Sequence, residues 1–374
     1  MKQFFSQIGQ EIYVPQNLSI KSGSIYFWGN DNLYPYKLLE AYYNSPTHKS
    51  LIDSKVNGII GEGVVVENQS NLDTYLSFGN QDLNTLAKNI AKDLVLYNSF
   101  AMKVVSSLDN KYKHIKSLDY TGVRYSTNID DEGDSTSIIY SRDWRNCYLK
   151  ENRKKEYFIY NPNSEEPLQV FIYGEEIKGG EKYTRPSYEA AMESIICEHE
   201  IQLFTLRNIK NNYTPAMLIK LKKEMTPEDF SLFKNNLKEN YQGSENAGGV
   251  LILAGESPET TPDVEFITPT TQDNVYIEQM SNIRTNILTS HQVTNPAIGG
   301  LSTGSQFSNG DEIRVAYDLF DRTVISNLRN TIENSLNTVF KNSGWNIGKI
   351  SIVPTNYDLN TKNNDNTQTQ TVSQ

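Results

Sequence analysis

The sequence has 374 residues, a formal net charge of −10 and an apolar share of 37%. This length is enough for a large core or for two or three structural regions, whereas the apolar share is below that of an ordinary globular domain. The negative charge argues against a tight nucleic-acid groove, which would concentrate lysine and arginine. It does not exclude a protein past which DNA slides without being held.

The two cysteines, Cys147 and Cys197, are far apart and have no metal-binding spacing. We therefore expect no disulfide framework and a reduced, intracellular setting. The first residues lack the basic start and apolar core of a signal peptide, and no stretch approaches the length of a transmembrane helix. We expect no contact with a membrane.

Tyrosine is unusually common, with 23 residues. Its ring is apolar at one end and forms hydrogen bonds at the other, which suits wide, half-wet interfaces. We therefore expect the tyrosines to serve contacts between copies of the chain. The low apolar share fits this expectation, and it also fits a polar, glycan-binding protein.

The first half of the chain predicts a mixed module. Turn residues interrupt short apolar pieces up to Asn30, which predicts an extended arm or short strands. Ser45 and Pro46 separate two predicted helices, the second of which ends near Gly61, and a third helix is predicted over 84–96. Strand-like stretches separated by turns then extend to about Tyr183. Residues 1–185 are therefore predicted to be α+β.

The second half predicts long helices around a small insert. One helix is predicted over 187–211 and another over 273–294, with a strand, a helix capped by Thr226 and two further strands between them. A last helix is predicted from about Asn309 to Lys341, followed by a strand, while 357–374 has no apolar periodicity and is predicted to be disordered. The predicted buried stripe of the last helix is Ile313, Tyr317, Phe320, Val324, Leu328, Ile332 and Leu336.

No active site is recognisable. None of the four histidines has a two-histidine zinc spacing, and His199 lies between Glu198 and Glu200 on a predicted helix, where adjacent residues do not face one another. The acidic stretch 130–134 lacks the spacing of a calcium-binding loop and predicts a polar turn. We expect no catalytic residue, no metal and no cofactor, with a hydrolase whose site we do not recognise as the remaining enzymatic alternative.

A glycine-rich segment at 297–309 precedes the last helix. A phosphate cradle would need a lysine and a preceding strand, but this segment has no lysine and follows a helix. Asp311 and Glu312 at the start of the next helix would also repel a phosphate. The pattern therefore favours a functional mobile loop, with a plain linker as the alternative.

Several stretches, in order, resemble portal proteins of tailed double-stranded DNA bacteriophages. The stretch "NDNLYPYKLLEAYYNSPTHKSLIDSKVNGIIGEGV" resembles the start of one portal subgroup, and "IAKDLVLYNSFAMKVV" resembles the family's helix, tight turn and strand. The stretch "NNYTPAMLIKLKKEMTPEDFSLFKNNLKENYQGSENAGGVLILAG" is similar to the family's small domain, and "SHQVTNPAIGG" to the helix end that leads into its channel loop. The likeness extends to about Asn356.

This resemblance implies an α+β portal-like fold. Its parts would be a wing (1–185), a first stem helix (186–212), a clip (213–271), a second stem helix (272–296), a tunnel loop (297–309), and a tunnel or crown helix with a closing strand (310–356). Little sequence follows Lys341, which puts any role of a crown in doubt.

The resemblance also implies a function. A portal forms a ring of copies of itself, expected to be a dodecamer, at one capsid vertex, and double-stranded DNA is packaged and ejected through its channel. Its partners are the terminase large subunit, the head-tail adaptor and the major capsid protein. The chain would belong to the virion and be assembled in the host cytoplasm, without enzymatic activity. An adaptor or capsid subunit is the alternative among assembly proteins.

Three groups of site residues follow from the resemblance. The lysines of the third group would either touch the DNA backbone loosely or pair with acidic groups of a partner. The groups are the loop residues Gly299, Gly300, Leu301, Ser302, Thr303, Gly304, Ser305 and Gln306; the channel-lining candidates Glu189, Glu193 and Glu200; and the clip lysines Lys210, Lys220, Lys222 and Lys223.

Overall fold

The structure is a computed structural model, and it describes residues 19–174, 181–210, 216–220, 228, 231–232, 263–267, 273–293, 295–300 and 310–356. Contacts between residues divide the chain into two compact units. The first unit combines residues 1–193 with residues 286–374, and the second consists of residues 194–285.

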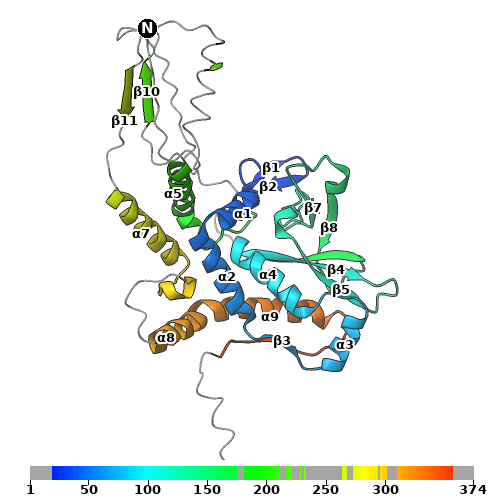
Figure 1. The fold of residues 1–374 in the computed structure, drawn as a ribbon. Helices are drawn as coiled ribbons and strands as arrows, with labels where there is room; N and C mark the ends of the chain where they lie inside the picture. Colours follow the sequence, from blue (N-terminus) through cyan, green and yellow to red (C-terminus); the bar gives the residue numbers. More distant parts are fainter. Residues whose placement is uncertain are drawn as a thin grey trace, which may run out of the picture. The chain divides into compact units, whose positions relative to one another are not determined.

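The N-terminal part of the first unit alternates helices with short strands (Figure 1). Ser45 separates the first two helices, because its Oγ accepts a hydrogen bond from the His48 amide at 3.2 Å. Asp82 caps a later helix through the Thr85 amide, and Asn98 ends that helix in a left-handed conformation. These elements are β1 (Ile20–Ser22), β2 (Ile25–Phe27), α1 (Tyr34–Asn44), α2 (Pro46–Ile60), β3 (Gly63–Val66), α3 (Gln69–Ser77) and α4 (Leu83–Tyr97).

A six-stranded sheet follows, with the strand order β5-β4-β9-β8-β7-β6. Only β8 and β9 pair in parallel, and the other neighbours are antiparallel. Helix α4 lies beside β4 and β5 (Figure 1), which accounts for its long buried stripe. The strands and intervening short helices are β4 (Ser99–Ser106), β5 (Lys113–Leu118), η1 (Tyr120–Gly122), β6 (Val123–Tyr125), β7 (Ser137–Tyr140), η2 (Lys150–Asn152), β8 (Lys155–Ile159) and β9 (Leu168–Gly174).

An aromatic cluster fills the core beside this sheet. Trp28 is fully buried, and it stacks on Tyr183 with a centroid distance of 4.8 Å. The rings of Tyr97 and Tyr120 meet Trp28 edge-on at 5.8 and 5.3 Å. The expectation that the tyrosines serve contacts between copies is wrong for a large group of them, because they lie in the core. These fully buried tyrosines are Tyr34, Tyr42, Tyr75, Tyr97, Tyr120, Tyr183 and Tyr188.

Arg124 lies in the same core, with none of its surface exposed. Its guanidinium donates to the carbonyl oxygens of Thr121, Val123 and Asn32 at 2.8, 2.7 and 2.8 Å. It also lies over the ring of Trp28, 5.6 Å from the centroid. Carbonyl oxygens and an aromatic face thus surround this buried cation.

The C-terminal part of the first unit contains one nearly continuous helix and a closing strand. Helix α8 (Gly310–Phe320) passes through the π-helical turn η7 (Asp321–Ile325) into α9 (Ser326–Lys341), as Figure 1 shows. Strand β12 (Ile350–Val353) then pairs antiparallel with β3. The sequence predicts both strands, but their pairing across nearly 300 residues has no local signal.

The π turn changes which residues the last helix buries. A π turn adds one residue to a helical turn, so Phe320 and Ile325 both face inward. The predicted stripe of regular spacing is therefore wrong in its middle, where Val324 and Leu328 are only half-buried. Below the turn the stripe returns, and Ile332 and Leu336 are fully buried.

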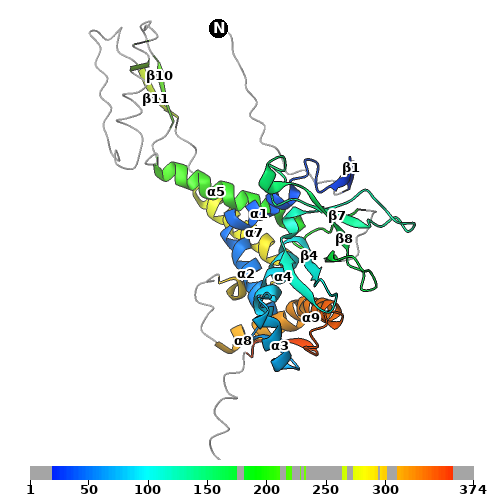
Figure 2. The same ribbon diagram turned by 90° about the vertical axis from the view of Figure 1, so that its right-hand side faces the viewer.

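The second unit contains parts of two helices and a strand pair. Helix α5 (Met192–Lys210) follows the 3-10 turn η3 (Glu189–Ala191), so it begins five residues later than the sequence suggests, and α7 spans Asp273–Ser290. Strands β10 (Ala216–Lys220) and β11 (Asp263–Ile267) pair antiparallel and lie side by side in Figures 1 and 2. Both strands were predicted, whereas the strand predicted at 248–255 lies outside the described residues.

Candidate functional site

The glycine-rich segment begins on a short helix that is hydrogen-bonded to α2. This helix, η5 (Pro296–Gly299), starts at Asn295, whose Oδ1 accepts from the Ala297 amide at 2.9 Å. Two serines of α2 hold its end: Ser50 Oγ donates to the Gly299 carbonyl at 2.6 Å, and Ser54 Oγ donates to the Ile298 carbonyl at 3.0 Å. These hydrogen bonds hold Ile298 and Gly299 against α2.

The geometry favours glycine at two positions, Gly299 and Gly300. A Cβ atom on Gly299 would lie 2.9 Å from Leu51 Cδ2, which is too close for contact. Gly300 has a φ of 71°, a left-handed conformation that favours glycine. The sequence explains these glycines by freedom of movement, but a close approach and a tight turn explain them here. The other predicted loop residues, 301–306, lie outside the described residues.

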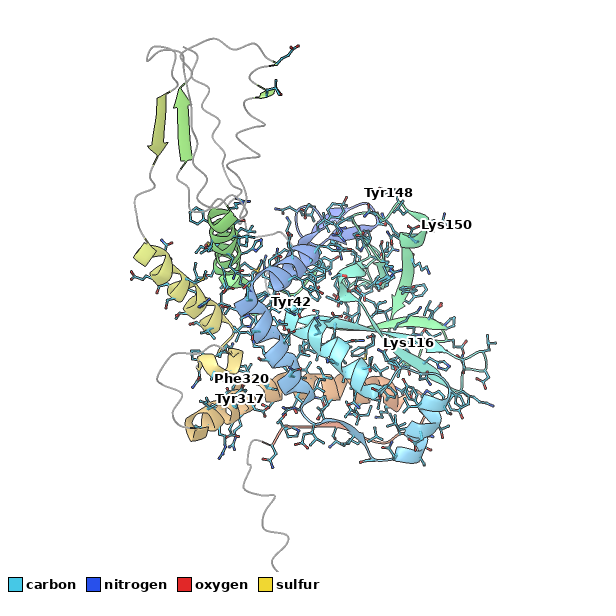
Figure 3. The ribbon with its side chains drawn as sticks, viewed as in Figure 1. Tyr42, Lys116, Tyr148, Lys150, Tyr317 and Phe320 are labelled. Atoms are coloured by element: carbon cyan, nitrogen blue, oxygen red, sulfur yellow. The ribbon has the colours of Figure 1, made fainter. Side chains whose placement is uncertain are left out.

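A cavity of about 190 Å³ lies next to η5. Tyr317 and Phe320 of α8, which Figure 3 labels, form part of its wall. The Tyr317 hydroxyl is 3.5 Å from the Ala297 carbonyl, so α8 contacts the same short helix as α2 does. The cavity is lined by Ser54, Asn57, Gly58, Ile298, Tyr317, Phe320, Asp321, Ile325 and Thr355.

The π turn closes one side of this cavity against α2. Arg329 is 6% exposed and forms an ion pair with Asp321 at 2.6 Å. It also donates to the carbonyls of Gly58 and Ile59 at 2.7 and 3.2 Å, at the C-terminal end of α2, where a cation is favoured. A Cβ atom on Gly58 would lie 3.4 Å from Ile325, so the two helices are already in contact there.

A buried pair of histidines lies near the other end of α2. His48 Nδ1 and His291 Nε2 are 2.9 Å apart, and both residues are fully buried. Tyr188 stacks on His291 with a centroid distance of 5.3 Å and meets His48 edge-on at 4.4 Å. Burial, with a smaller contribution from Lys55, lowers the pKa of His48 to about 3 and that of His291 well below its usual value.

The histidine pair leaves one donor without a partner. Both rings are neutral near pH 7, so one ring nitrogen of each carries a proton, and one of these protons lies in the shared hydrogen bond. The outer nitrogens, His48 Nε2 and His291 Nδ1, are buried and have no hydrogen-bond partner among the described residues. Whichever tautomer is present, one buried N–H therefore remains unsatisfied, which costs about 1–3 kcal/mol.

Lys55 adds a third buried polar group to this region. It is 4% exposed, and it has no hydrogen bond or ion pair with any residue that the structure describes. Burial alone lowers its pKa to about 8. Sequence reasoning missed this group, because His48 and Lys55 are distant from His291 along the chain and no motif joins them.

The predicted channel-lining glutamates have different surroundings. Glu193 and Glu200 are exposed on α5. Glu189 instead accepts hydrogen bonds from Arg185 at 2.7 Å and from the Tyr34 hydroxyl at 2.9 Å, and its side chain is 17% exposed. Glu189 thus already has a cation and a hydroxyl as partners within its own chain.

The predicted clip lysines are only partly described. Lys210 ends α5, and Lys220 ends β10 opposite Asp263 of β11. Lys222 and Lys223 lie outside the described residues. The side chains of Lys210 and Lys220 also lie outside what the structure describes, so the proposed contacts of these four lysines stay predictions.

The acidic stretch 130–134 is a polar turn, as the sequence predicts. Asp130 Oδ1 accepts from the amides of Glu132 and Asp134 at 3.0 and 2.8 Å, so this carboxylate holds its own backbone. Among the described residues, no group of three or more histidine, cysteine or acidic side chains could hold a metal ion. Nor is any helix in this part of the chain both long and apolar enough to cross a membrane.

Solved structures resemble the chain over most of its length. A chain in the virion of a native gene transfer agent particle has a TM-score of 0.54 and 15% identity, covering 86% of this chain and 83% of that one. A chain in the neck of such a particle, computed with C12 symmetry, has a TM-score of 0.55 and 15% identity, covering 87% and 84%. An HK97-family phage portal protein from Corynebacterium diphtheriae has a TM-score of 0.48 and 11% identity, covering 80% and 89%.

No protein-family model and no curated protein match the chain. The likeness to solved structures is therefore one of fold. The chain has the α+β fold of these particle proteins, and the fold class predicted from the sequence is confirmed.

Proposed function

We propose that this chain is a portal protein, which forms a ring at one capsid vertex and provides the channel through which double-stranded DNA is packaged and ejected. The observation that carries the proposal is the fold match over 87% of the chain to a component of a particle neck computed with C12 symmetry. The ordered portal-like stretches of the sequence support it independently. A ring of twelve copies in the virion, assembled in the host cytoplasm, is the corresponding assembly.

Exposed apolar side chains support association between copies. Ile196, Phe204 and Leu206 on α5 are 41%, 45% and 46% exposed, and Val315 on α8 is 67% exposed. Apolar residues repeated on exposed helices are typical of protein interfaces rather than of a solvated surface. In a cyclic ring each copy uses two different surfaces, one for each neighbour.

The proposed parts of the portal follow the sequence boundaries. Residues 1–185 form the wing, 186–212 and 272–296 the stem helices, 213–271 the clip, 297–309 the tunnel loop and 310–356 the crown-side helix with its strand. The second compact unit, 194–285, contains the proposed clip together with the adjoining parts of both stem helices. The clip is the proposed docking region for the terminase large subunit and the head-tail adaptor, and the wing faces the major capsid protein.

The charge of the chain suits passage of DNA without capture. A net charge of −10 and the exposed carboxylates of Glu193 and Glu200 leave phosphates hydrated instead of binding them. Two serines of α2 fix the first residues of the tunnel loop in place, through the carbonyls of Ile298 and Gly299. The chain's proposed role is structural, without catalysis.

The test is the deletion of Leu301–Ser305, which removes five loop residues beyond the fastened turn. We expect the variant to form rings of normal size, and particles assembled with it to lose most of their packaged or retained DNA. A deletion in the polar turn, Asp131–Gly133, is the matched control and should leave packaging intact. Normal DNA content in particles with the loop deletion would contradict the proposed role of the segment.

An adaptor or capsid subunit is the rival assignment. The two long helices α5 and α7 on either side of one small strand pair favour a portal over either. Particles assembled without the chain would distinguish a portal from an adaptor. A missing portal prevents DNA packaging, whereas a missing adaptor allows packaging and impairs DNA retention or tail joining.

A further inference from the structure

Helix α8 carries apolar side chains on two opposite faces. Tyr317 and Phe320 lie on the inner face, where they line the cavity beside η5. Val315 and Leu319 are 67% and 50% exposed, and they belong to the helix's outer face. A helix that packs only against its own chain needs one apolar face, so the outer pair is not explained by the fold of a single copy.

The helical repeat places these two faces on opposite sides. Each residue of an α-helix is rotated by about 100° from the one before it. Val315 and Leu319 are each two residues from Tyr317, so both point about 160° away from it. One copy therefore presents an aliphatic pair on one side of α8 and a cavity on the other.

The cavity has the size and chemistry to receive an aliphatic side chain. Its volume of about 190 Å³ exceeds the roughly 150 Å³ of an engineered protein cavity that holds benzene. Its single charged lining residue, Asp321, is already paired with Arg329 at 2.6 Å. The other walls combine apolar side chains with neutral polar ones, so the half-open cavity has room for a leucine side chain and offers no partner to an added charge.

The walls of the cavity are also fixed before any partner arrives. Arg329 ties the π turn to the end of α2, and Ser54 ties α2 to η5. Ile325 packs on Gly58 at one side. A preformed cavity binds with less loss of conformational entropy than one that must be assembled.

We propose that Leu319 of one copy, with Val315 beside it, inserts into the cavity of the next copy around the ring, between Asn57, Tyr317 and Ile325 of that copy. Such a contact joins two different surfaces, and it can be repeated from copy to copy until a ring closes. The proposal rests on the proposed function only in requiring a ring. Beyond that, it assigns a contact between neighbours to the helix that follows the tunnel loop.

The chain's own sequence after Asn356 is a second candidate occupant of the cavity, because Thr355 lines it. That sequence is mostly polar, and its apolar residues are Tyr357, Leu359 and Val372. A chain that ends at Asn356 separates the two occupants. If the neighbour's Leu319 fills the cavity, the shortened chain forms the same rings; loss of rings on truncation would contradict the proposal.

Crosslinking of the full-length protein tests the contact directly. Cys147→Ser and Cys197→Ser first remove the native thiols, of which Cys197 is exposed. Asn57→Cys and Leu319→Cys are then combined in the same chain and treated with a short thiol-specific crosslinker. The expected result is a ladder of covalently linked copies up to the full ring, whereas each single-cysteine variant gives no ladder.

A second variant gives the energetic test. Leu319→Asp places a charge in the neutral cavity, and we expect association of copies to weaken at least about tenfold. Leu319→Met keeps an apolar side chain and should form rings. The control is Ile129→Asp, because Ile129 is 51% exposed in the distant polar turn and closely matches Leu319 in exposure.

The outcomes separate this inference from the proposed function. Rings of the unmodified chain that form no ladder, and that survive Leu319→Asp, would overturn the contact and leave the portal assignment standing. An unmodified chain that forms no ring would overturn both. A ladder together with the loss of rings in Leu319→Asp supports the contact.

Discussion

Two buried cations of the first unit have opposite surroundings. Arg124, in the aromatic core, donates hydrogen bonds to three carbonyl oxygens and lies over Trp28. Lys55, on α2, is almost as deeply buried and has no such partner among the described residues. Besides burial, Lys55 contributes to the lowered pKa of both His48 and His291, and this neutral pair leaves a ring N–H unsatisfied among the described residues.

The two regions differ in whether their buried polar groups find hydrogen-bond partners within one copy of the chain. Buried polar groups are normally paired, and those that are not mark strain or function. The aromatic core satisfies its buried arginine internally, although the indole N–H of Trp28 is buried there without a partner among the described residues. The region around α2 combines Lys55, which has no hydrogen bond to a described residue, with an unsatisfied histidine, a cavity and an exposed aliphatic pair, and it adjoins the start of the proposed tunnel loop.

The largest expected effect on stability comes from removing Arg124, whose hydrogen bonds are satisfied within the core. Arg124→Met would leave three buried carbonyl oxygens without their donor, and we expect a loss of roughly 3–5 kcal/mol in the free energy of unfolding. Urea denaturation followed by circular dichroism measures it. A loss below about 1 kcal/mol would mean that water replaces the guanidinium and that the core is less closed than described.

Acid should destabilise the region around α2, which contains His48 and His291. Burial lowers the pKa of His48 in the folded chain from 6.5 to about 3, so between these values the unfolded chain binds more protons. The stability that His48 contributes is thus complete above pH 6.5 and is lost as the pH falls, by roughly 3 kcal/mol at pH 4 for this residue alone.

The double variant His48→Gln, His291→Gln isolates this effect from that of the carboxyl groups. Denaturation curves at pH 7 and pH 4 should differ less for the variant than for the unmodified chain. An equal acid sensitivity of the two proteins would show that the histidines are not buried in their neutral form.

Removing Lys55 should raise the free energy of unfolding, whereas removing Arg124 should lower it. Lys55→Met exchanges a lysine side chain that is 4% exposed for a thioether of similar length, and we expect a gain of about 1–2 kcal/mol near pH 7. The burial that lowers the pKa of Lys55 to about 8 also makes the stability of the unmodified chain rise from pH 8 to 10.5. The variant should lack this rise.

Lys49→Met is the matched control on the same helix. Lys49 pairs with Asp53 at 3.0 Å on the surface, with a side chain that is 43% exposed. Such a pair contributes about 0–1 kcal/mol, so this variant should be neutral or slightly less stable. Destabilisation by Lys55→Met would indicate that Lys55 has a partner and that the comparison is wrong.

The smallest expected effect comes from removing a hydrogen bond between α2 and η5. Ser54→Ala removes the donor to the Ile298 carbonyl, which should cost about 1 kcal/mol and expose the turn before the tunnel loop to proteolysis. Ser70→Ala, in the exposed helix α3, removes a serine hydrogen bond far from the segment and should leave the cleavage pattern unchanged. Unaltered proteolysis of Ser54→Ala would mean that Ser50 alone fixes the turn.

The sequence predicted the elements well where the signal is local. Ser45 and Asp82 mark helix starts, and alternating apolar residues mark the strands of the sheet. The π turn was missed because it shifts the buried positions from Val324 and Leu328 to Ile325 and Arg329 without changing composition.

The candidate site was less predictable, because its parts come together only in the fold. His48 and His291 are separated by 243 residues, and neither lies in a motif. Gly299 and Gly300 were identified as part of a loop, but their roles in a close approach to Leu51 and in a left-handed turn depend on the position of α2.

The most direct test of the portal assignment is negative-stain electron microscopy of the purified full-length chain. The account predicts rings, expected to contain twelve copies, with a central hole wide enough for duplex DNA. A stable monomer or dimer at all concentrations, or a closed assembly without such a hole, would contradict it.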